Sequence, residues 1–586
     1  MRNNSIYIEG KVTTQALVIG PQMSDFVFEL HPSLTLDSVK VNGLSTVETT
    51  NGTFKECALT NPIAANTMFT AEIWYHGTPT STGPAAIGEG ISTGQSPSWG
   101  NRVTWTLSEP YSAYEWWPCK QSLNDKIDSI DVWITVGDSL KAGSNGLLKQ
   151  VTPIAGNKLR YEWKHRYPID YYLVSATVAK YVDYSFYAYP DGSADSVLIQ
   201  NYIYDNPQTL PYFKTQIDLT KNFIEEFAQL YGPYPFEQEK YGHCMAPFGG
   251  GMEHQTMTSQ GNFSFELTAH ELAHQWFGDK VTCASWKDIW VNEGFASYSE
   301  YVALQILQPN QALAHLNDYH QSSLSELGGS VYVDDTTDPG RIFSGRLTYD
   351  KGATLVHMLR FIVNDDAVFF QALRNYLQAH AYRTATAEDV KAAFENAAPI
   401  SLDHFFEDYY YGEGYPTFSL RWKKSSNGRI YLKLTQTASK PNVTPLFRIP
   451  VEIRFNSSAG DTTLRVMSDA PEVFFEFEYG RTATSAQIDP NQWILNMTGS
   501  ILQDNTLDIN ESSLDNISIY PNPSNDKIYL DGFSIGETIS ITSLDGKVIR
   551  TLQIIQDKQA IPLDGIADGS YIIISKSGNY RFLKSK

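Results

Sequence analysis

His270-Glu271-Leu272-Ala273-His274, within a helical pattern over residues 266–277, is the segment that decides the fold and chemistry of this chain. Histidines four residues apart lie on one face of a helix, with Cβ atoms about 5–6 Å apart, so both imidazoles can bind one cation. Neutral imidazoles suit Zn²⁺, and a catalytic zinc ion normally takes three protein ligands and keeps a fourth position open. The spacing therefore predicts a catalytic zinc site that includes His270 and His274.

The third ligand and the catalytic base are expected close to this pair. Glu293 follows His274 by nineteen residues, which leaves enough chain for a turn and a second helix packed against the first. Glu271 is adjacent to the first ligand, so its carboxylate can lie beside the metal without binding it. A general base must occupy that place to take a proton from the attacking water. We therefore expect Glu293 as the third metal ligand and Glu271 as the base.

The same spacing supports a family resemblance. HExxH followed by eighteen residues and a glutamate resembles the signature of gluzincin zinc aminopeptidases, which are related to aminopeptidase N and the leukotriene hydrolases. Gly250-Gly251-Met252-Glu253-His254 resembles the G-x-M-E-N exopeptidase motif of that family, with histidine in place of asparagine. The resemblance implies that Gly250, Gly251, Met252 and Glu253 bind the substrate. A buried carboxylate such as Glu253 distinguishes a free α-ammonium group from an internal amide by charge pairing.

Two further motifs extend the resemblance. Residues 108–113, followed by Pro118-Cys119, resemble the E-P-x-x-A…P-C stretch of the family, which implies that Glu109 is a second carboxylate reaching the substrate amine. Residues 349–353 resemble its Y-x-K-G-A motif, which implies that the Tyr349 hydroxyl points at the oxyanion of the reaction. Without the family, Glu109 would be an ordinary loop carboxylate and Tyr349 one of many core tyrosines.

Changes in hydrophobic period divide the chain. Strand patterns run to about residue 185, helical patterns dominate from about 210 to 410, and strand patterns return after the Gly-Pro-rich break at 412–416. We expect a multidomain α+β protein with five parts: an N-terminal β domain (1–185), a helical catalytic domain (186–411), a β-sandwich (412–502), a linker (503–516) and a small C-terminal β-sandwich tail (517–586). The family resemblance implies that the catalytic domain is a thermolysin-like zinc domain.

The composition excludes several classes of protein. The 586 residues carry a formal net charge of −21, which argues against nucleic acid or an anionic membrane as the main partner. No apolar run reaches the ~18–20 residues that a transmembrane helix requires. The four cysteines are scattered and form no CxxC pair, which argues against a disulfide framework and against a cysteine-based zinc site.

The C-terminal region carries a resemblance of its own. Tyr520-Pro521-Asn522-Pro523, Leu544–Lys547 and Asp568–Tyr571 resemble the sorting domain of proteins exported by the type IX secretion route of Bacteroidetes. This resemblance implies that the secretion machinery is a partner and that the protein is secreted or attached to the cell surface. Residues 1–5 lack an apolar h-region, so no signal peptide is expected in this sequence. A small carbohydrate-binding or adhesion sandwich is the alternative for the tail.

Together these patterns predict a zinc-dependent aminopeptidase that removes N-terminal amino acids from peptides by metal-activated water. One zinc ion is the expected cofactor. A metalloendopeptidase, an epoxide hydrolase of the leukotriene-hydrolase kind and a non-catalytic surface-binding protein remain the alternatives, because HExxH alone does not decide what is cleaved.

Overall fold

The computed structural model describes residues 1–79, 90–190, 196–425, 428–507, 517–543, 547–575 and 578–585. Residues 508–516 of the expected linker and residues 544–546 of the second tail motif lie outside the described residues. The chain divides into two compact units. The first unit contains Met1–Ala393, Tyr409–Gly414 and Gln492–Leu495, and the second contains Phe394–Asp408, Tyr415–Asn491 and Asn496–Lys586.

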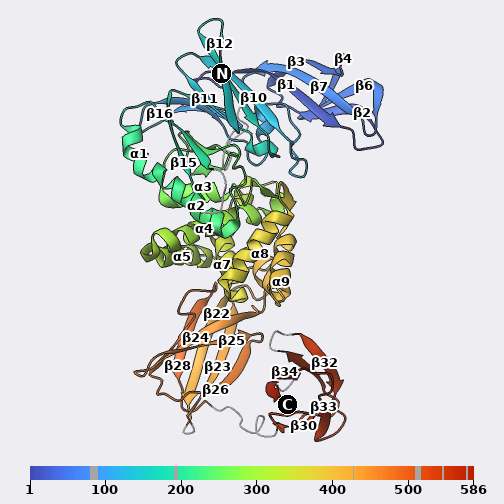
Figure 1. Cartoon of the computed structure of the whole chain (residues 1–586), viewed down its shortest axis with the longest axis vertical. Coiled ribbons are helices and arrows are strands. Elements are labelled where there is room, and N and C mark those ends of the chain that lie inside the picture. Colours follow the sequence, from blue (N-terminus) through green and yellow to red (C-terminus); the bar gives the residue numbers. More distant parts are fainter. Residues whose placement is uncertain are drawn as a thin grey trace. The chain divides into compact units, whose positions relative to one another are not determined.

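The first unit begins with two antiparallel sheets, drawn in blue in Figure 1. One has the strand order β1-β7-β3-β4 and the other the order β2-β6-β5. Buried and more exposed residues alternate along the central strand β7, as expected for a strand with one face in the core. Its buried residues are Phe69, Ala71, Ile73 and Tyr75. The strands are β1 (Ile8–Leu17), β2 (Gln22–Glu29), β3 (Leu34–Val41), β4 (Leu44–Thr46), β5 (Glu48–Asn51), β6 (Phe54–Ala64) and β7 (Met68–Gly77).

Two smaller antiparallel sheets follow, with strand orders β11-β14-β9-β8 and β10-β13-β12. Glu109 lies in the segment that leaves β9, so this part of the chain delivers one of the expected site residues. The strands are β8 (Ile91–Gln95), β9 (Arg102–Thr106), β10 (Ile130–Gly137), β11 (Lys141–Gly143), β12 (Leu147–Ile154), β13 (Lys158–His165) and β14 (Thr177–Ala179).

A five-stranded mixed sheet, of order β15-β16-β17-β19-β18, leads into the helices. Its short edge strand β18 contains Gly251 and Met252 of the expected exopeptidase motif. The expected boundary at 185/186 falls inside β15, and it stays a prediction. The strands are β15 (Tyr181–Ala188), β16 (Val197–Tyr204), β17 (Tyr241–Met245), β18 (Gly251–Met252) and β19 (Thr258–Gln260).

Helices α3 and α4 pack against each other, with α2 against α3 and with α5 and α7 against α4 (Figure 1). A two-stranded parallel sheet joins β20 (Val281–Cys283) to β21 (Arg383–Ala385). The main helices are α1 (Thr209–Asp218), α2 (Thr220–Tyr231), α3 (Phe265–Ala273), α4 (Trp290–Leu307), α5 (Pro309–Leu324), α6 (Pro339–Ile342), α7 (Gly352–Val363), α8 (Asp366–Ala379) and α9 (Ala387–Ala397).

Helix α3 is shorter than the expected pattern over 266–277, because it ends at Ala273. His274 keeps helical angles of φ −56° and ψ −26° as the C-cap residue. The chain then turns, with Asp279 N donating to His274 O at 2.9 Å. The two histidines therefore keep their helical relation although the regular helix has ended.

The second unit contains two packed sheets, of orders β26-β23-β22-β28 and β25-β24-β27. Trp422 of β22 and Phe455 of β24 meet with ring centroids 5.4 Å apart, so the sheets share a core. The strands are β22 (Pro416–Lys424), β23 (Arg429–Ala438), β24 (Ile449–Asn456), β25 (Thr462–Ser468), β26 (Glu472–Glu478), β27 (Ser485–Ile488) and β28 (Met497–Gln503). The short helix α10 (Asp403–Phe405) precedes them.

The tail forms two sheets around one hydrophobic cluster that includes Ile541, Ile561 and Phe582. Their strand orders are β29-β30-β33 and β32-β31-β34-β35. The strands are β29 (Ser518–Tyr520), β30 (Lys527–Asp531), β31 (Thr538–Ser543), β32 (Val548–Gln553), β33 (Gln559–Pro562), β34 (Gly569–Ser575) and β35 (Gly578–Lys584). The multidomain fold class expected from the sequence is confirmed: a β-rich N-terminal part, a helical region and a β tail.

Two further findings concern the whole described chain. Cys57, Cys119, Cys244 and Cys283 are buried free thiols. Among the residues that the structure describes, no helix combines the length and the apolar character needed to cross a membrane.

Candidate active site

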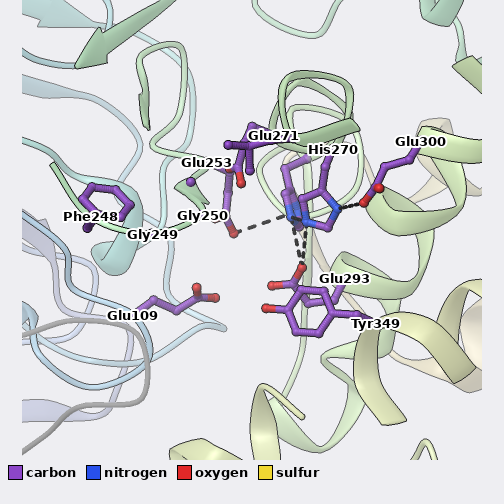
Figure 2. Close-up of a pocket in the computed structure, with 13 residues that line it drawn as sticks. Glu109, Phe248, Gly249, Gly250, Glu253, His270, Glu271, Glu293, Glu300 and Tyr349 are labelled. Atoms are coloured by element: carbon purple, nitrogen blue, oxygen red, sulfur yellow. Dashed lines mark hydrogen bonds and ion pairs between the residues drawn. The ribbon is translucent and has the colours of Figure 1, made fainter. Parts of the chain in front are cut away.

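The three expected metal ligands converge on one point, with α3 supplying the histidines and α4 the glutamate (Figure 2). Nε2 of His270 and Nε2 of His274 are 3.0 Å apart. Glu293 Oε2 lies 3.2 Å from the first nitrogen and 3.1 Å from the second. Ligand atoms bound at ~2.1 Å to one tetrahedral ion lie ~3.4 Å apart, so this nearly equilateral set of two nitrogens and one oxygen fits Zn²⁺.

Each histidine is held from behind by a second partner. His270 Nδ1 is 2.8 Å from Glu300 Oε1, and His274 Nδ1 is 3.0 Å from the carbonyl oxygen of Phe277. Glu300 also pairs with His315 of α5, at 3.2 Å. Such contacts fix the ring orientation of a ligating histidine and leave Nε2 facing the metal.

Sequence reasoning missed Glu300, although one signal was available. It follows Glu293 by seven residues on α4, so two helical turns place both carboxylates on the same face.

The buried carboxylates around the ligands favour a bound cation. Burial would raise the pKa of Glu293, but His274 and His270 lower it to about 2. Burial would lower the pKa of His274, but Glu253 and Glu293 raise it to about 10. The buried acids thus favour positive charge at this point, and a divalent ion supplies it while leaving both imidazoles neutral.

Glu271 lies beside the ligands without joining them. Burial raises its pKa to about 8, which suits a carboxylate that must accept a proton near neutral pH. Its Oε2 atom has no hydrogen-bond partner among the described residues. A Cβ atom on Gly251 would lie only 2.3 Å from Glu271 Oε1, so the glycine of β18 makes room for this carboxylate.

Glu109 and Glu253 bring two more buried carboxylates to the same pocket. Glu109, Glu253 and Glu293 each place one oxygen within 4.8 Å of the others. Burial raises the pKa of Glu109 well above its usual range, and the nearby Glu253 and Glu293 raise it further. Neither Glu109 Oε1 nor Glu253 Oε1 has a hydrogen-bond partner in the described part of the chain. The nearest cationic group to Glu253 is the ring of the metal ligand His274, whose Nδ1 lies 4.0 Å from Glu253 Oε1. The two carboxylates can therefore accept hydrogen bonds from a positively charged ligand.

The loop that carries Glu253 is tied to the metal-binding segment. Gln275, directly after His274, donates from Nε2 to the Glu253 carbonyl at 3.3 Å. Its Oε1 accepts from Thr256 N at 2.9 Å. The buried Lys240 side chain donates to the Thr256 carbonyl at 2.9 Å. Thr256 has a φ of 68°, a strained value for a β-branched residue, so these bonds hold an otherwise unfavourable turn.

A second set of hydrogen bonds reaches this loop from the connection between β11 and β12. Asn145 Nδ2 donates to the Gln255 carbonyl at 2.7 Å, and Gly146 N donates to Thr256 Oγ1 at 2.7 Å. The position of Glu253 is thus fixed from both sides.

Tyr349 lies on a π-helix, Gly345–Lys351, which runs directly into α7. Its ring stacks on His270, with centroids 5.9 Å apart and planes 24° apart. Burial raises the pKa of its hydroxyl well above the usual range, so the group stays protonated and can donate a hydrogen bond. A π-helix widens one turn, a feature that is frequent at functional sites and that sequence periodicity did not predict.

These residues line one pocket of about 450 Å³. Met252 is the exception among the expected site residues, because it is 1% exposed and does not line the pocket. Phe248, Gly249 and Leu267 line it without having been expected. The described residues that line it are Glu109, Phe248, Gly249, Gly250, Gly251, Glu253, Leu267, His270, Glu271, His274, Glu293, Glu300 and Tyr349.

Two segments of the chain match known families. Residues 220–409 match the peptidase family M1 domain, and residues 518–585 match the secretion system C-terminal sorting domain. The first match includes the three ligands, Glu271, Glu253 and Tyr349, whereas Glu109 lies before it.

Curated relatives resemble part of the chain. Aminopeptidase N of Mus musculus is 29% identical over 324 residues, which are 50% of this chain and 32% of the relative. Aminopeptidase N of Lactobacillus delbrueckii subsp. lactis is 28% identical over 249 residues, 38% of this chain and 28% of the relative. The chain thus spans about a third or less of the length of these relatives.

Solved structures share the fold. A two-domain M1 zinc metallopeptidase with bound L-tryptophan superposes with a TM-score of 0.59 and 23% identity, covering 67% of this chain and 87% of that one. An M1 zinc metallopeptidase from Deinococcus radiodurans gives a TM-score of 0.58 and 24% identity, with 67% and 87% coverage. These likenesses show that about two thirds of this chain shares the fold of the M1 zinc metallopeptidases.

Proposed function

We propose, on the premise that residues 220–409 form a peptidase family M1 domain, that this chain is a zinc-dependent aminopeptidase. One observation carries the proposal: a two-histidine, one-glutamate set faces the same pocket as two buried carboxylates that each have an oxygen without a hydrogen-bond partner among the described residues. The first suits a metal that activates a carbonyl, and the second suits the charged end of a peptide. The curated relatives named aminopeptidase N support this reading.

The metal would be held by His270, His274 and Glu293. A bound zinc ion supplies a Lewis acid that polarises the scissile carbonyl and makes the attacking water more acidic. Glu271 accepts the proton of that water at its unpaired Oε2 and passes it to the leaving amine.

Tyr349 and the two free carboxylates act on the substrate itself. The protonated Tyr349 hydroxyl donates to the carbonyl oxygen as negative charge develops on it. Glu109 and Glu253 bind the α-ammonium group, which selects the first peptide bond for cleavage. A blocked or internal chain brings no cation to these carboxylates, which argues against an endopeptidase.

Paired substrates test the proposal. Phenylalanyl 4-nitroanilide and its N-acetyl twin are compared with the purified full chain, with and without 1,10-phenanthroline, alongside metal analysis. We expect the free amine to be cleaved at least about 100-fold faster, and the chelator to stop cleavage. Glu271→Gln should keep the metal and lower kcat by about 10²–10⁴-fold. Equal rates on the two substrates would instead identify an endopeptidase.

For the tail, we propose that residues 518–585 direct export, so that the enzyme acts outside the cell or on its surface. Deleting residues 517–586 from the full chain should leave the protein inside the cells that normally export it. Unchanged export of the shortened chain would favour the binding-sandwich alternative.

A further inference from the structure

The direction of the first substrate side chain follows from the pocket and from simple covalent geometry. This step rests on the proposed function. The first Cα bears the scissile carbonyl, the ammonium group and Cβ. With the carbonyl at the metal ligands and the ammonium at Glu109 and Glu253, Cβ must lead away from both. In Figure 2, Phe248 and Gly249 lie on the opposite side of Glu253 from His270.

The wall on that side is open. A Cβ atom placed on Gly249 or on Gly250 would meet no heavy atom of the described residues within 4 Å. Gly250 has a φ of +78° and so requires glycine, but Gly249 has no such restriction. The two glycines therefore leave unfilled space beside the ammonium site.

The Phe248 ring borders this space and packs against a second aromatic ring. Phe248 is half-buried, and its ring stacks on Trp105 of β9 with centroids 6.2 Å apart and planes 28° apart. Trp105 is itself packed against Gly94 of β8, where an added Cβ would lie 3.3 Å from the indole. A fixed ring beside open space offers a surface for apolar and aromatic groups.

The charges of the pocket decide against the other side-chain classes. Among the described residues, the lining holds five glutamates and no lysine or arginine, so an acidic first residue meets only like charge. A basic first residue finds no spare acid either. Glu109 and Glu253 bind the ammonium group, Glu293 is a ligand, Glu271 is the base, and Glu300 pairs with His270 and His315.

We infer that the preferred substrates begin with a large apolar or aromatic residue, whose side chain packs on Phe248 and fills the space over Gly249 and Gly250. Phe248 is thus a residue that determines specificity, and Gly249 keeps the space open for the substrate.

Kinetics on a panel of 4-nitroanilides of Phe, Leu, Ala, Lys and Glu test this inference. We expect kcat/KM for Phe and Leu to exceed that for Ala by about tenfold or more, with Glu the poorest. Phe248→Ala and Gly249→Leu should each lower the Phe-to-Ala ratio by about tenfold, and Phe248→Leu should restore part of it. Gly20→Leu, a glycine with equally open surroundings far from the pocket in sequence, should leave the ratio unchanged.

A binding measurement separates specificity from turnover. Calorimetry with zinc-loaded Glu271→Gln should show L-phenylalanine binding about tenfold more tightly than L-alanine, a difference lost when Phe248→Ala is added. Fastest cleavage of the Lys or Ala substrate, or a Phe-to-Ala ratio insensitive to Gly249→Leu, would overturn the inference while leaving an aminopeptidase. Failure to cleave any free aminoacyl anilide would instead overturn the proposed function, and the inference with it.

Discussion

The two sides of the pocket are built on opposite principles. On the metal side, each histidine has a second partner, Glu300 or the Phe277 carbonyl, and Glu293 lies within 3.2 Å of both rings. On the other side, which we call the anchor side, Glu109 and Glu253 each keep an oxygen without a hydrogen-bond partner among the described residues, and burial raises the pKa of both. The ligands of the metal ion are held in fixed orientations by neighbouring groups. The carboxylates that bind the substrate ammonium group keep oxygens free to accept its hydrogen bonds.

Removing the metal is expected to have the largest effect on activity, because it acts on the metal side alone. Dialysis against 1,10-phenanthroline should lower kcat/KM by more than about 10³-fold, because carbonyl activation is lost. It should also lower the unfolding temperature, because an ion that binds only the folded state stabilises it. Restored activity on adding zinc is the control. A metal-free protein that retains activity would contradict the assignment of the ligands.

The glycine beside the base gives the next largest effect. In Gly251→Ala, the new Cβ would lie 2.3 Å from Glu271 Oε1, so the carboxylate must move. A displacement of about 1 Å can cost 10²-fold in rate, and we expect that loss in kcat with the metal content unchanged. Gly20→Ala, at a position with open surroundings, is the matched control. Normal kcat in Gly251→Ala would show that the carboxylate position is not critical.

Equal charge changes on the two sides sharpen the contrast. Glu253→Gln should lower kcat/KM for free-amine substrates by about 10–100-fold, because one ammonium partner is lost. It should also stabilise the substrate-free protein by about 1 kcal/mol, because three crowded carboxylates become two.

Glu300→Gln removes the same charge from the metal side and should instead weaken zinc binding by about tenfold. Steady-state kinetics, thermal unfolding and zinc titration separate the two variants. Identical behaviour of both would remove the distinction between the sides.

The smallest expected effect concerns Gln275, which links the metal-binding segment to the loop that carries Glu253. Gln275→Met keeps the side-chain volume but removes the bonds to the Glu253 carbonyl and to Thr256 N. The loop that carries Glu253 should become more mobile. We therefore expect KM for free-amine substrates to rise about fivefold and the zinc stoichiometry to stay unchanged. N-acetylated substrates serve as the control, since they do not use the anchor. A parallel loss of zinc would show that Gln275 acts on the metal-binding segment.

The sequence predicted those parts of the site that depend on local geometry. Residues i and i+4 of a helix meet whatever surrounds them, so the spacing of His270 and His274 was sufficient to predict a shared ligand position. The alternating and helical periods likewise predicted the β-rich, helical and β-rich order of the chain. Roles carried by family motifs, such as that of Tyr349, needed the resemblance as well.

Packing between distant segments lay beyond that reasoning. Gln275 contacts Glu253 only because α3 and the β18–β19 loop fold together, and no short-range pattern contains this information. The early end of α3 depends on a turn after His274, and the π-helix at Tyr349 interrupts the expected period. Met252 was expected to bind substrate by its place in a motif, whereas the pleat of β18 turns it into the core and turns Gly251 towards Glu271.

Asn145, Gly146 and Glu109 all come from connections between the N-terminal strands, and this origin limits which fragments of the chain can keep the complete site. The conventional unit of protein engineering, a catalytic domain excised at a change of sequence pattern, would here begin near residue 186. Such a fragment would contain every metal ligand but only one of the two acids that recognise where a peptide begins. Hydrolysis and recognition of the peptide N-terminus thus depend on different segments of this chain.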